Sequence, residues 1–89
     1  MKAIVTVVGK DKKGIIAKVS TALYECGVNI VDISQTIMQD MFTMIMMVEF
    51  GAENVSVQDI TNRLSEIEQE MGLKIHVQRE EIFSSMHRI

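Results

Sequence analysis

Cysteine, aromatic residues and basic charge are all scarce in this chain of 89 residues, and each shortage narrows its possible functions. The single cysteine, Cys26, excludes an internal disulfide and a metal site built on a cysteine pair. Aromatic residues make up 4% of the chain, too few for an RNA-binding sheet that stacks bases on exposed rings. The net charge of −3 argues against a general nucleic-acid binder, which carries a basic patch.

Long apolar runs are missing as well. No stretch approaches the roughly 20 residues of a membrane-spanning helix. The first residues also lack the apolar core and cleavage site of an export signal. We therefore expect a cytoplasmic protein that does not act at a membrane. The length suits one domain. Its hydrophobic content of 47% implies either a generous core or apolar surface that a partner covers.

Hydrophobic patterning predicts six elements in the order β-α-β-β-α-β. Strands are expected over residues 3–8, 28–38, 41–50 and 73–78, and helices over residues 15–26 and 57–71. The second helix has the clearest signal, with Ser56 as its N-cap and Gly72 just beyond its end. This order predicts an α+β, ferredoxin-like sandwich: a four-stranded antiparallel sheet with both helices on one face and the first and third strands in the centre.

The third strand is apolar on both of its faces. One set of alternate residues should face the helices (Phe42, Met44, Met46, Val48 and Phe50), and the other should face away from them (Met41, Ile45 and Met47). Five of the eight methionines lie between Met38 and Met47, as adaptable core filling or as a pliable interaction surface. The apolar set on the uncovered face favours a partner, most simply a second copy of the chain.

A polar loop flanked by glycines, Gly9 to Gly14, joins the first strand to the first helix. We expect the strand to end at Gly9, and Asp11 to cap the helix by accepting the N–H of Gly14. Helix N-termini attract anions because their N–H groups are unpaired. The three lysines of this loop are therefore either a solvated surface or an anion-attracting rim. Asn29 begins the second strand, two residues after Gly27.

Taken together, these segments resemble the ACT domain family, small ligand-binding regulatory modules of amino-acid metabolism. The resemblance is carried by the loop with the two isoleucines that follow it, by Glu-Cys-Gly at the end of the first helix, and by Val-Asn-Ile-Val-Asp-Ile on the second strand. It covers about residues 2–79. We take residues 1–79 as the domain and 80–89 as a C-terminal tail suited to a short helix. The chain is most similar to stand-alone single-domain bacterial members, and more distantly to the glycine cleavage system repressor group.

The resemblance implies a homodimer that binds a small molecule. ACT domains pair side by side through edge strands, and an amino acid binds between the first loop of one subunit and the second strand of the other. The positions that match this role are Asp11, Gly14, Ile15, Asn29 and Ile30. By the same resemblance, Asp11 pairs with an ammonium group, Gly14 lets the ligand approach the backbone, and Asn29 donates and accepts hydrogen bonds. N–H groups near Ile15 and Ile30 would bind the carboxylate or the side chain.

Two positions depart from the family pattern. Lys13 stands where many members have proline, and Gly9 stands where some amino-acid-binding members have a polar side chain. The site residues also have purely structural explanations. Asp11 suits a helix cap, Gly14 suits a turn, and Asn29 suits local backbone groups.

No catalytic, metal or cofactor site is expected. The first loop has lysines but not the arginine of acylphosphatase-like chemistry, and no Ser–His–acid set is apparent. His76 and His87 have no cysteine nearby to complete a metal site. We therefore predict a non-catalytic regulatory module that senses an amino acid or related metabolite and reports it to a regulated protein partner. The alternative is a protein interaction or dimerisation module without a bound ligand.

Overall fold

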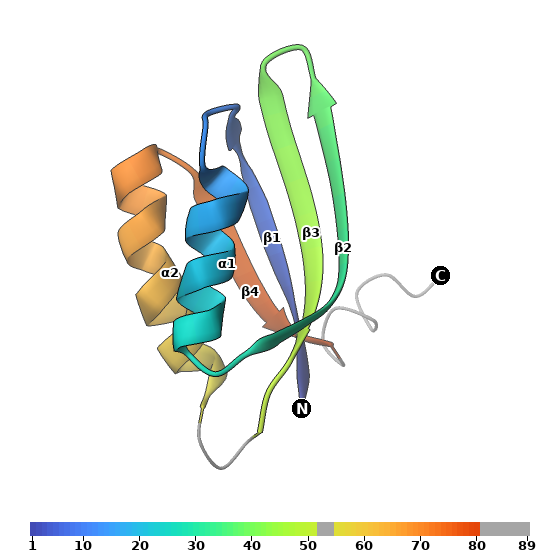
Figure 1. Cartoon of the computed structure of the whole chain (residues 1–89), viewed down its shortest axis with the longest axis vertical. Helices are drawn as coiled ribbons and strands as arrows, with labels where there is room; N and C mark the ends of the chain where they lie inside the picture. Colours follow the sequence, from blue (N-terminus) through green and yellow to red (C-terminus); the bar gives the residue numbers. More distant parts are fainter. Residues whose placement is uncertain (52–54, 81–89) are drawn as a thin grey trace.

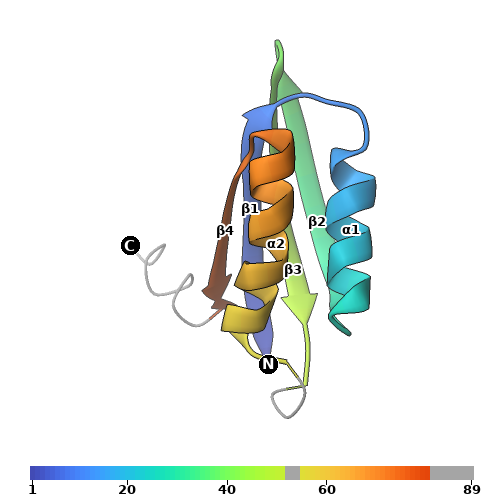
Figure 2. The same ribbon diagram turned by 90° about the vertical axis from the view of Figure 1, so that its left-hand side faces the viewer.

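The computed structural model describes residues 1–51 and 55–80. Its elements are β1 (Lys2–Lys10), α1 (Ile15–Glu25), β2 (Asn29–Met38), β3 (Met41–Glu49), α2 (Val57–Met71) and β4 (Lys74–Arg79). The strands form one antiparallel sheet in the order β2-β3-β1-β4, and both helices lie on the same side of it (Figures 1 and 2). The predicted ferredoxin-like fold with β1 and β3 in the centre is confirmed. The predicted tail helix falls, beyond Glu80, outside the described residues.

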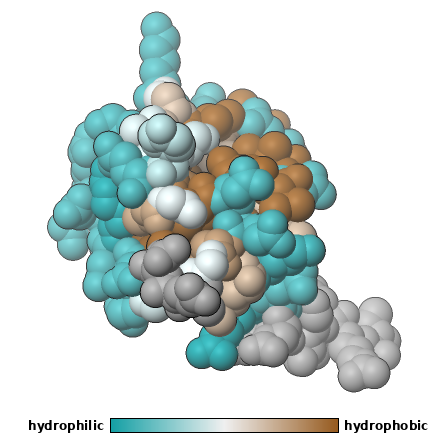
Figure 3. Space-filling view, turned by 60° about the horizontal axis from the view of Figure 1, so that its bottom comes forward, coloured by the Kyte–Doolittle hydropathy of each residue, from teal (hydrophilic) through white to brown (hydrophobic). Residues whose placement is uncertain are grey.

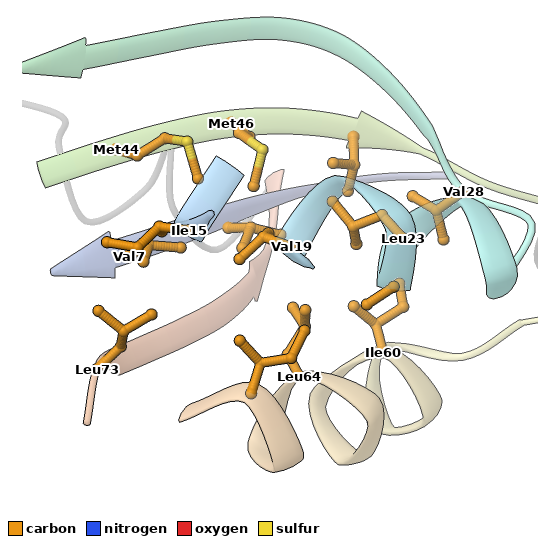
Figure 4. Packing of buried hydrophobic residues seen from close by; sticks show 14 of the residues in the cluster. Val7, Ile15, Val19, Leu23, Val28, Met44, Met46, Ile60, Leu64 and Leu73 are labelled. Carbon is orange, nitrogen blue, oxygen red and sulfur yellow. The ribbon is translucent and has the colours of Figure 1, made fainter. Parts of the chain in front are cut away.

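The core fills the space between the sheet and the two helices. Met44 and Met46 of β3 point toward α1, where Val19 and Leu23 meet them, and Leu64 of α2 approaches from the other side (Figure 4). All five side chains are buried. Core filling is therefore confirmed for Met44 and Met46, whereas Met38 and Met41 remain exposed.

β1 continues through Gly9 to Lys10, so the strand end predicted at Gly9 is wrong. A Cβ atom added to Gly9 would lie 2.5 Å from Cδ2 and 3.3 Å from Cα of Leu73. Leu73 follows α2 and is buried in the core. The strand can therefore pass this connection only because residue 9 has no side chain.

β2 contains an irregularity near its start. Its register with β3 shifts between Ile30 and Asp32, which is the pattern of a β-bulge. Ile30 packs against the core, whereas Val31 is exposed. The bulge places Ile30, opposite Val48, on the same face of the sheet as Ile33, opposite Met46, although the two are three residues apart.

The two edge strands differ in how open they are. In β4, the backbone N–H of Ile75 donates to Oε2 of Glu68 at 2.7 Å, so a carboxylate from α2 occupies this outward-pointing donor. In β2, the N–H of Ile33 donates to Oδ1 of its own neighbour Asp32 at 2.9 Å, a bond within one dipeptide. None of the other described strands pairs with the outer edge of β2.

Apolar surface accumulates near this open edge. β2 exposes Val31, Ile33, Ile37 and Met38. In Figure 3, hydrophobic surface gathers on the right-hand side, the side on which β2 lies in Figure 1. The edge therefore offers apolar side chains beside backbone groups that none of the other described strands pairs with.

The start of α2 gives a first prediction. Ser56 accepts the N–H of Asp59 at 3.1 Å, and the Asp59 carboxylate accepts the N–H of Ser56 at 3.0 Å, which forms a capping box. We expect Ser56→Ala to lower the free energy of unfolding by about 1 kcal/mol, measured by urea denaturation. Ser65→Ala, within the same helix, is the control and should be neutral or stabilising. Equal losses in both variants would contradict a capping role.

Candidate functional site

The loop between β1 and α1 is held by two bonds to distant segments. The N–H of Asp11 donates to the carbonyl of Asp40 in the β2–β3 turn at 2.7 Å. Nζ of Lys12 donates to the carbonyl of Met71, the last residue of α2, at 2.9 Å. The loop is therefore fixed at both sides, although its residues are largely exposed.

α1 begins at Ile15, directly after Gly14. Gly14 is the N-cap with φ of 86°, and no side chain in the described part of the chain caps the helix. The predicted cap by Asp11 is therefore wrong. The left-handed turn at Gly14 places the N-cap three residues beyond Asp11. The backbone N–H groups of the first turn are left for another acceptor. A Cβ atom on Gly14 would meet nothing within 4 Å, so a ligand can approach the backbone here.

A cavity of about 470 Å³ lies at this helix end. It is lined by the loop and the first turn of α1, including Asp11, Gly14 and Ile15 of the predicted site. Gln35 and Ile37 of β2 and Phe42 of β3 complete the lining. Sequence reasoning missed Gln35. Gln35 lies between Ile33 and Ile37 on the helix side of β2. A polar residue within this apolar series was the feature of the sequence that could have identified it as a site residue.

The structure does not bring Asn29 and Ile30 to this cavity. They lie at the start of β2, beyond the C-terminal end of α1, whereas the cavity is at the N-terminal end (Figure 1). The eleven residues of α1 separate the two ends by about 16 Å. One subunit therefore holds two separate halves of the predicted site.

The charged side chains near the cavity differ in whether they already have a partner. The Lys12 ammonium is bound to the Met71 carbonyl. The Asp11 carboxylate makes no hydrogen bond or ion pair with the described residues. Lys18 pairs with Glu70 on the opposite side of α1, facing α2. Of the two charged side chains in the lining, Asp11 and Lys12, the carboxylate of Asp11 is thus the one without a hydrogen bond to the described residues.

A larger hollow, of about 520 Å³, lies between the start of α2 and β4. Ser56 lines it, and its side chain already accepts an N–H of the first turn of α2. This helix end therefore has less to offer a ligand than the start of α1.

Cys26 and His76 lie away from the cavity at the start of α1. Cys26 is half-buried against the core at the end of α1, and burial raises the pKa of its thiol, although Arg63 acts in the opposite direction. His76 lies on β4 opposite Thr6, and His87 is outside the described residues. Among residues 1–51 and 55–80, no group of three or more His, Cys, Asp or Glu residues is placed to hold a metal ion. None of the helices there is long and apolar enough to cross a membrane.

Two comparisons cover almost the whole chain. The UPF0237 protein of Clostridium acetobutylicum is 52% identical over 89 residues, all of both chains. The solved structure of an ACT domain protein from Streptococcus pneumoniae is 44% identical, covers 93% of each chain and has a TM-score of 0.80.

Larger proteins share the fold over part of their length. A putative glycine cleavage system transcriptional repressor matches 88% of this chain and 44% of its own, with 24% identity and a TM-score of 0.78. The regulatory subunit of aspartate kinase from Thermus thermophilus matches 86% of this chain and 50% of its own, with 25% identity and a TM-score of 0.70. The ACT domain family itself matches residues 2–78. The chain therefore belongs to the ACT domain family, whose members are regulatory modules that bind small molecules.

Proposed function

We propose that this chain is a non-catalytic regulatory module, a homodimer that senses an amino acid or related metabolite between its subunits. The observation that carries the proposal is the start of α1 behind Gly14, which no described side chain caps and which lies in a cavity beside the Asp11 carboxylate. The N–H groups of a helix N-terminus receive a carboxylate, and a carboxylate receives an ammonium. An amino-acid zwitterion presents both groups, whereas a bare phosphate presents only negative charge.

A second copy of the chain would bring its own Asn29 and Ile30 to the cavity, which these residues do not reach within one subunit. Antiparallel pairing of β2 with β2 of the partner subunit places the start of one strand beside the end of the other. Asn29 of the partner subunit then lies near the Met38 end of β2, close to Gln35 and Ile37 of the cavity. Pairing through β2 is favoured over β4, because β2 exposes Val31, Ile33, Ile37 and Met38, which a second copy would cover.

A ligand bound between two subunits stabilises their association, since it contacts both. The dimer would then report ligand concentration to a regulated protein partner. We place this function in the cytoplasm, without nucleic acid or membrane as a partner.

A screen of the twenty amino acids by thermal unfolding tests this proposal. At ten times its dissociation constant, a ligand that binds only the folded state stabilises it by about 1.4 kcal/mol. For a domain of this size we expect the melting temperature to rise by about 5 to 10 °C. Absence of any shift at millimolar concentrations would reject amino-acid sensing.

The other sheet face supports a second candidate, an interaction module that needs no ligand. Met41 and Ile45 of β3 are exposed there, and none of the described elements covers them. This alternative predicts that a second protein is recovered with the chain from cell extract, whether or not amino acids are added. Recovery of the chain alone would count against it.

A further inference from the structure

We infer that the cavity at the start of α1 selects amino acids with uncharged, apolar side chains, such as leucine, isoleucine, methionine and phenylalanine. This inference rests on the proposed function and names the class of ligand for the same site. It follows from what remains of the cavity lining once the two charged groups common to all amino acids have been placed.

The α-carboxylate and α-ammonium groups, which all amino acids share, pair with the start of α1 and with Asp11. The α-carboxylate takes the N–H groups of the first turn of α1, and the α-ammonium takes the carboxylate of Asp11. Lys12 also lines the cavity, but its ammonium donates to the carbonyl of Met71 at 2.9 Å. Lys10 and Lys13, the other cations of the loop, are not part of the lining. The Lys12 ammonium keeps its charge, but this bond holds it at the C-terminal end of α2, beside Gly72. Apart from Lys12, no charged side chain among the described lining residues is left to pair with a charged ligand side chain.

The rest of the lining is apolar. Ile16 of α1 is 38% exposed and Ile37 of β2 is 50% exposed, although both are large hydrophobic residues. They border the cavity from two different elements, and Phe42 of β3 lies with them. Gln35 is the one neutral polar side chain in the lining, and its amide can satisfy a main-chain group of the ligand. Ligand pockets commonly have this composition, a mostly apolar wall with a few polar groups that fix orientation.

Selection follows from desolvation. An apolar ligand side chain gains by covering the exposed surfaces of Ile16 and Ile37. A lysine, arginine, aspartate or glutamate side chain would lose water against the same two residues without gaining a counter-charge. Apolar amino acids should therefore bind at least tenfold more tightly than charged ones.

Titration calorimetry of the whole chain with leucine, phenylalanine, lysine and glutamate tests the inference. We expect leucine or phenylalanine to bind at least tenfold more tightly than either charged amino acid. Ile37→Ser should weaken that binding at least tenfold. Ile45→Ser is the matched control, since Ile45 is similarly exposed at 41% on the other face of the sheet, and its affinity should stay within twofold. Ile16→Ser gives a second test should Ile37→Ser alter thermal unfolding.

The outcomes separate the inference from the function on which it rests. Equal or tighter binding of lysine or glutamate would overturn the apolar selection and leave amino-acid sensing intact. Unchanged leucine affinity in both cavity variants would also overturn it. Failure of all twenty amino acids to bind would instead reject the proposed function, and the inference with it.

Discussion

A serine in place of Gly9 is expected to lower the free energy of unfolding by about 3 kcal/mol, the upper end of the usual cost of overpacking a core. The added Cβ would lie 2.5 Å from Cδ2 of Leu73, well inside van der Waals contact. Leu73 is buried and cannot simply turn into solvent, and its Cα is only 3.3 Å from the same position. Chemical denaturation measures the loss, and the melting temperature should fall by more than 10 °C.

A double-mutant cycle identifies the contact responsible. Leu73→Ala alone should cost about 2 to 4 kcal/mol through the cavity it leaves. In the double variant, the serine at position 9 occupies part of that space. Its loss of unfolding free energy should therefore be at least about 1 kcal/mol smaller than the sum of the losses in the two single variants. Lys10→Ser, at an exposed position of the same strand, is the control and should change stability by less than about 0.5 kcal/mol. Strictly additive losses would show that Leu73 is not the obstacle.

This contact also bears on ligand recognition. Some amino-acid-binding members of the family carry a polar side chain where Gly9 stands. Here the connection between α2 and β4 fills that space with Leu73. Any ligand must therefore be recognised by other groups, and Gln35 is the additional polar side chain at the cavity.

Proline at position 33 is expected to weaken self-association about a hundredfold while leaving the subunit folded. The Ile33 N–H is bound to the Asp32 side chain, so it points away from β3 and is not part of the β2–β3 ladder. Proline removes this donor and obstructs a second strand. In a two-fold symmetric pair, each Ile33 N–H would exchange its bond to Asp32 for a carbonyl of the other strand. Proline in both copies leaves those two carbonyls without a donor, and a cost of about 1 to 2 kcal/mol for each gives a loss of that size.

Sedimentation velocity over a range of concentrations measures the change, and circular dichroism checks the fold. The control is Ser34→Pro, one residue along the strand, where the N–H points toward β3 because directions alternate. That variant should lose about 3 kcal/mol of subunit stability, the scale of a proline inside regular structure. A folded Ile33→Pro protein that still dimerises with its original affinity would show that the subunits meet through another surface.

Periodicity was sufficient to predict the order and the faces of most elements. The helical stripe from Val57 to Met71 and the alternation in β3 both reflect burial, which the structure confirms. The bulge in β2 was harder to predict, because one extra residue reverses the alternation of side chains between the two sheet faces and no glycine marks its position. The close approach of Gly9 to Leu73 joins residues 64 positions apart, and no local pattern contains it.

The candidate site was predictable in part. Asp11, Gly14 and Ile15 do line one cavity, as expected from a loop before a helix. The capping role of Asp11 failed because the conformation of Gly14 decides where the helix starts. Asn29 and Ile30 lie at the far end of the subunit, and the sequence linked them to this site only through the family resemblance. Their contribution remains a prediction about the dimer.

The bond between Glu68 and the N–H of Ile75 has a consequence for the size of the assembly. Two subunits joined along β2 form a continuous eight-stranded sheet whose outer strands are both β4. If the β4 strands accepted neighbours as β2 would in the proposed dimer, each dimer would add another and the sheet would polymerise. A carboxylate from α2 is already bound at the start of β4, and any new strand must displace it. In the proposed dimer, one acidic side chain on each subunit would thus help to end growth at two copies.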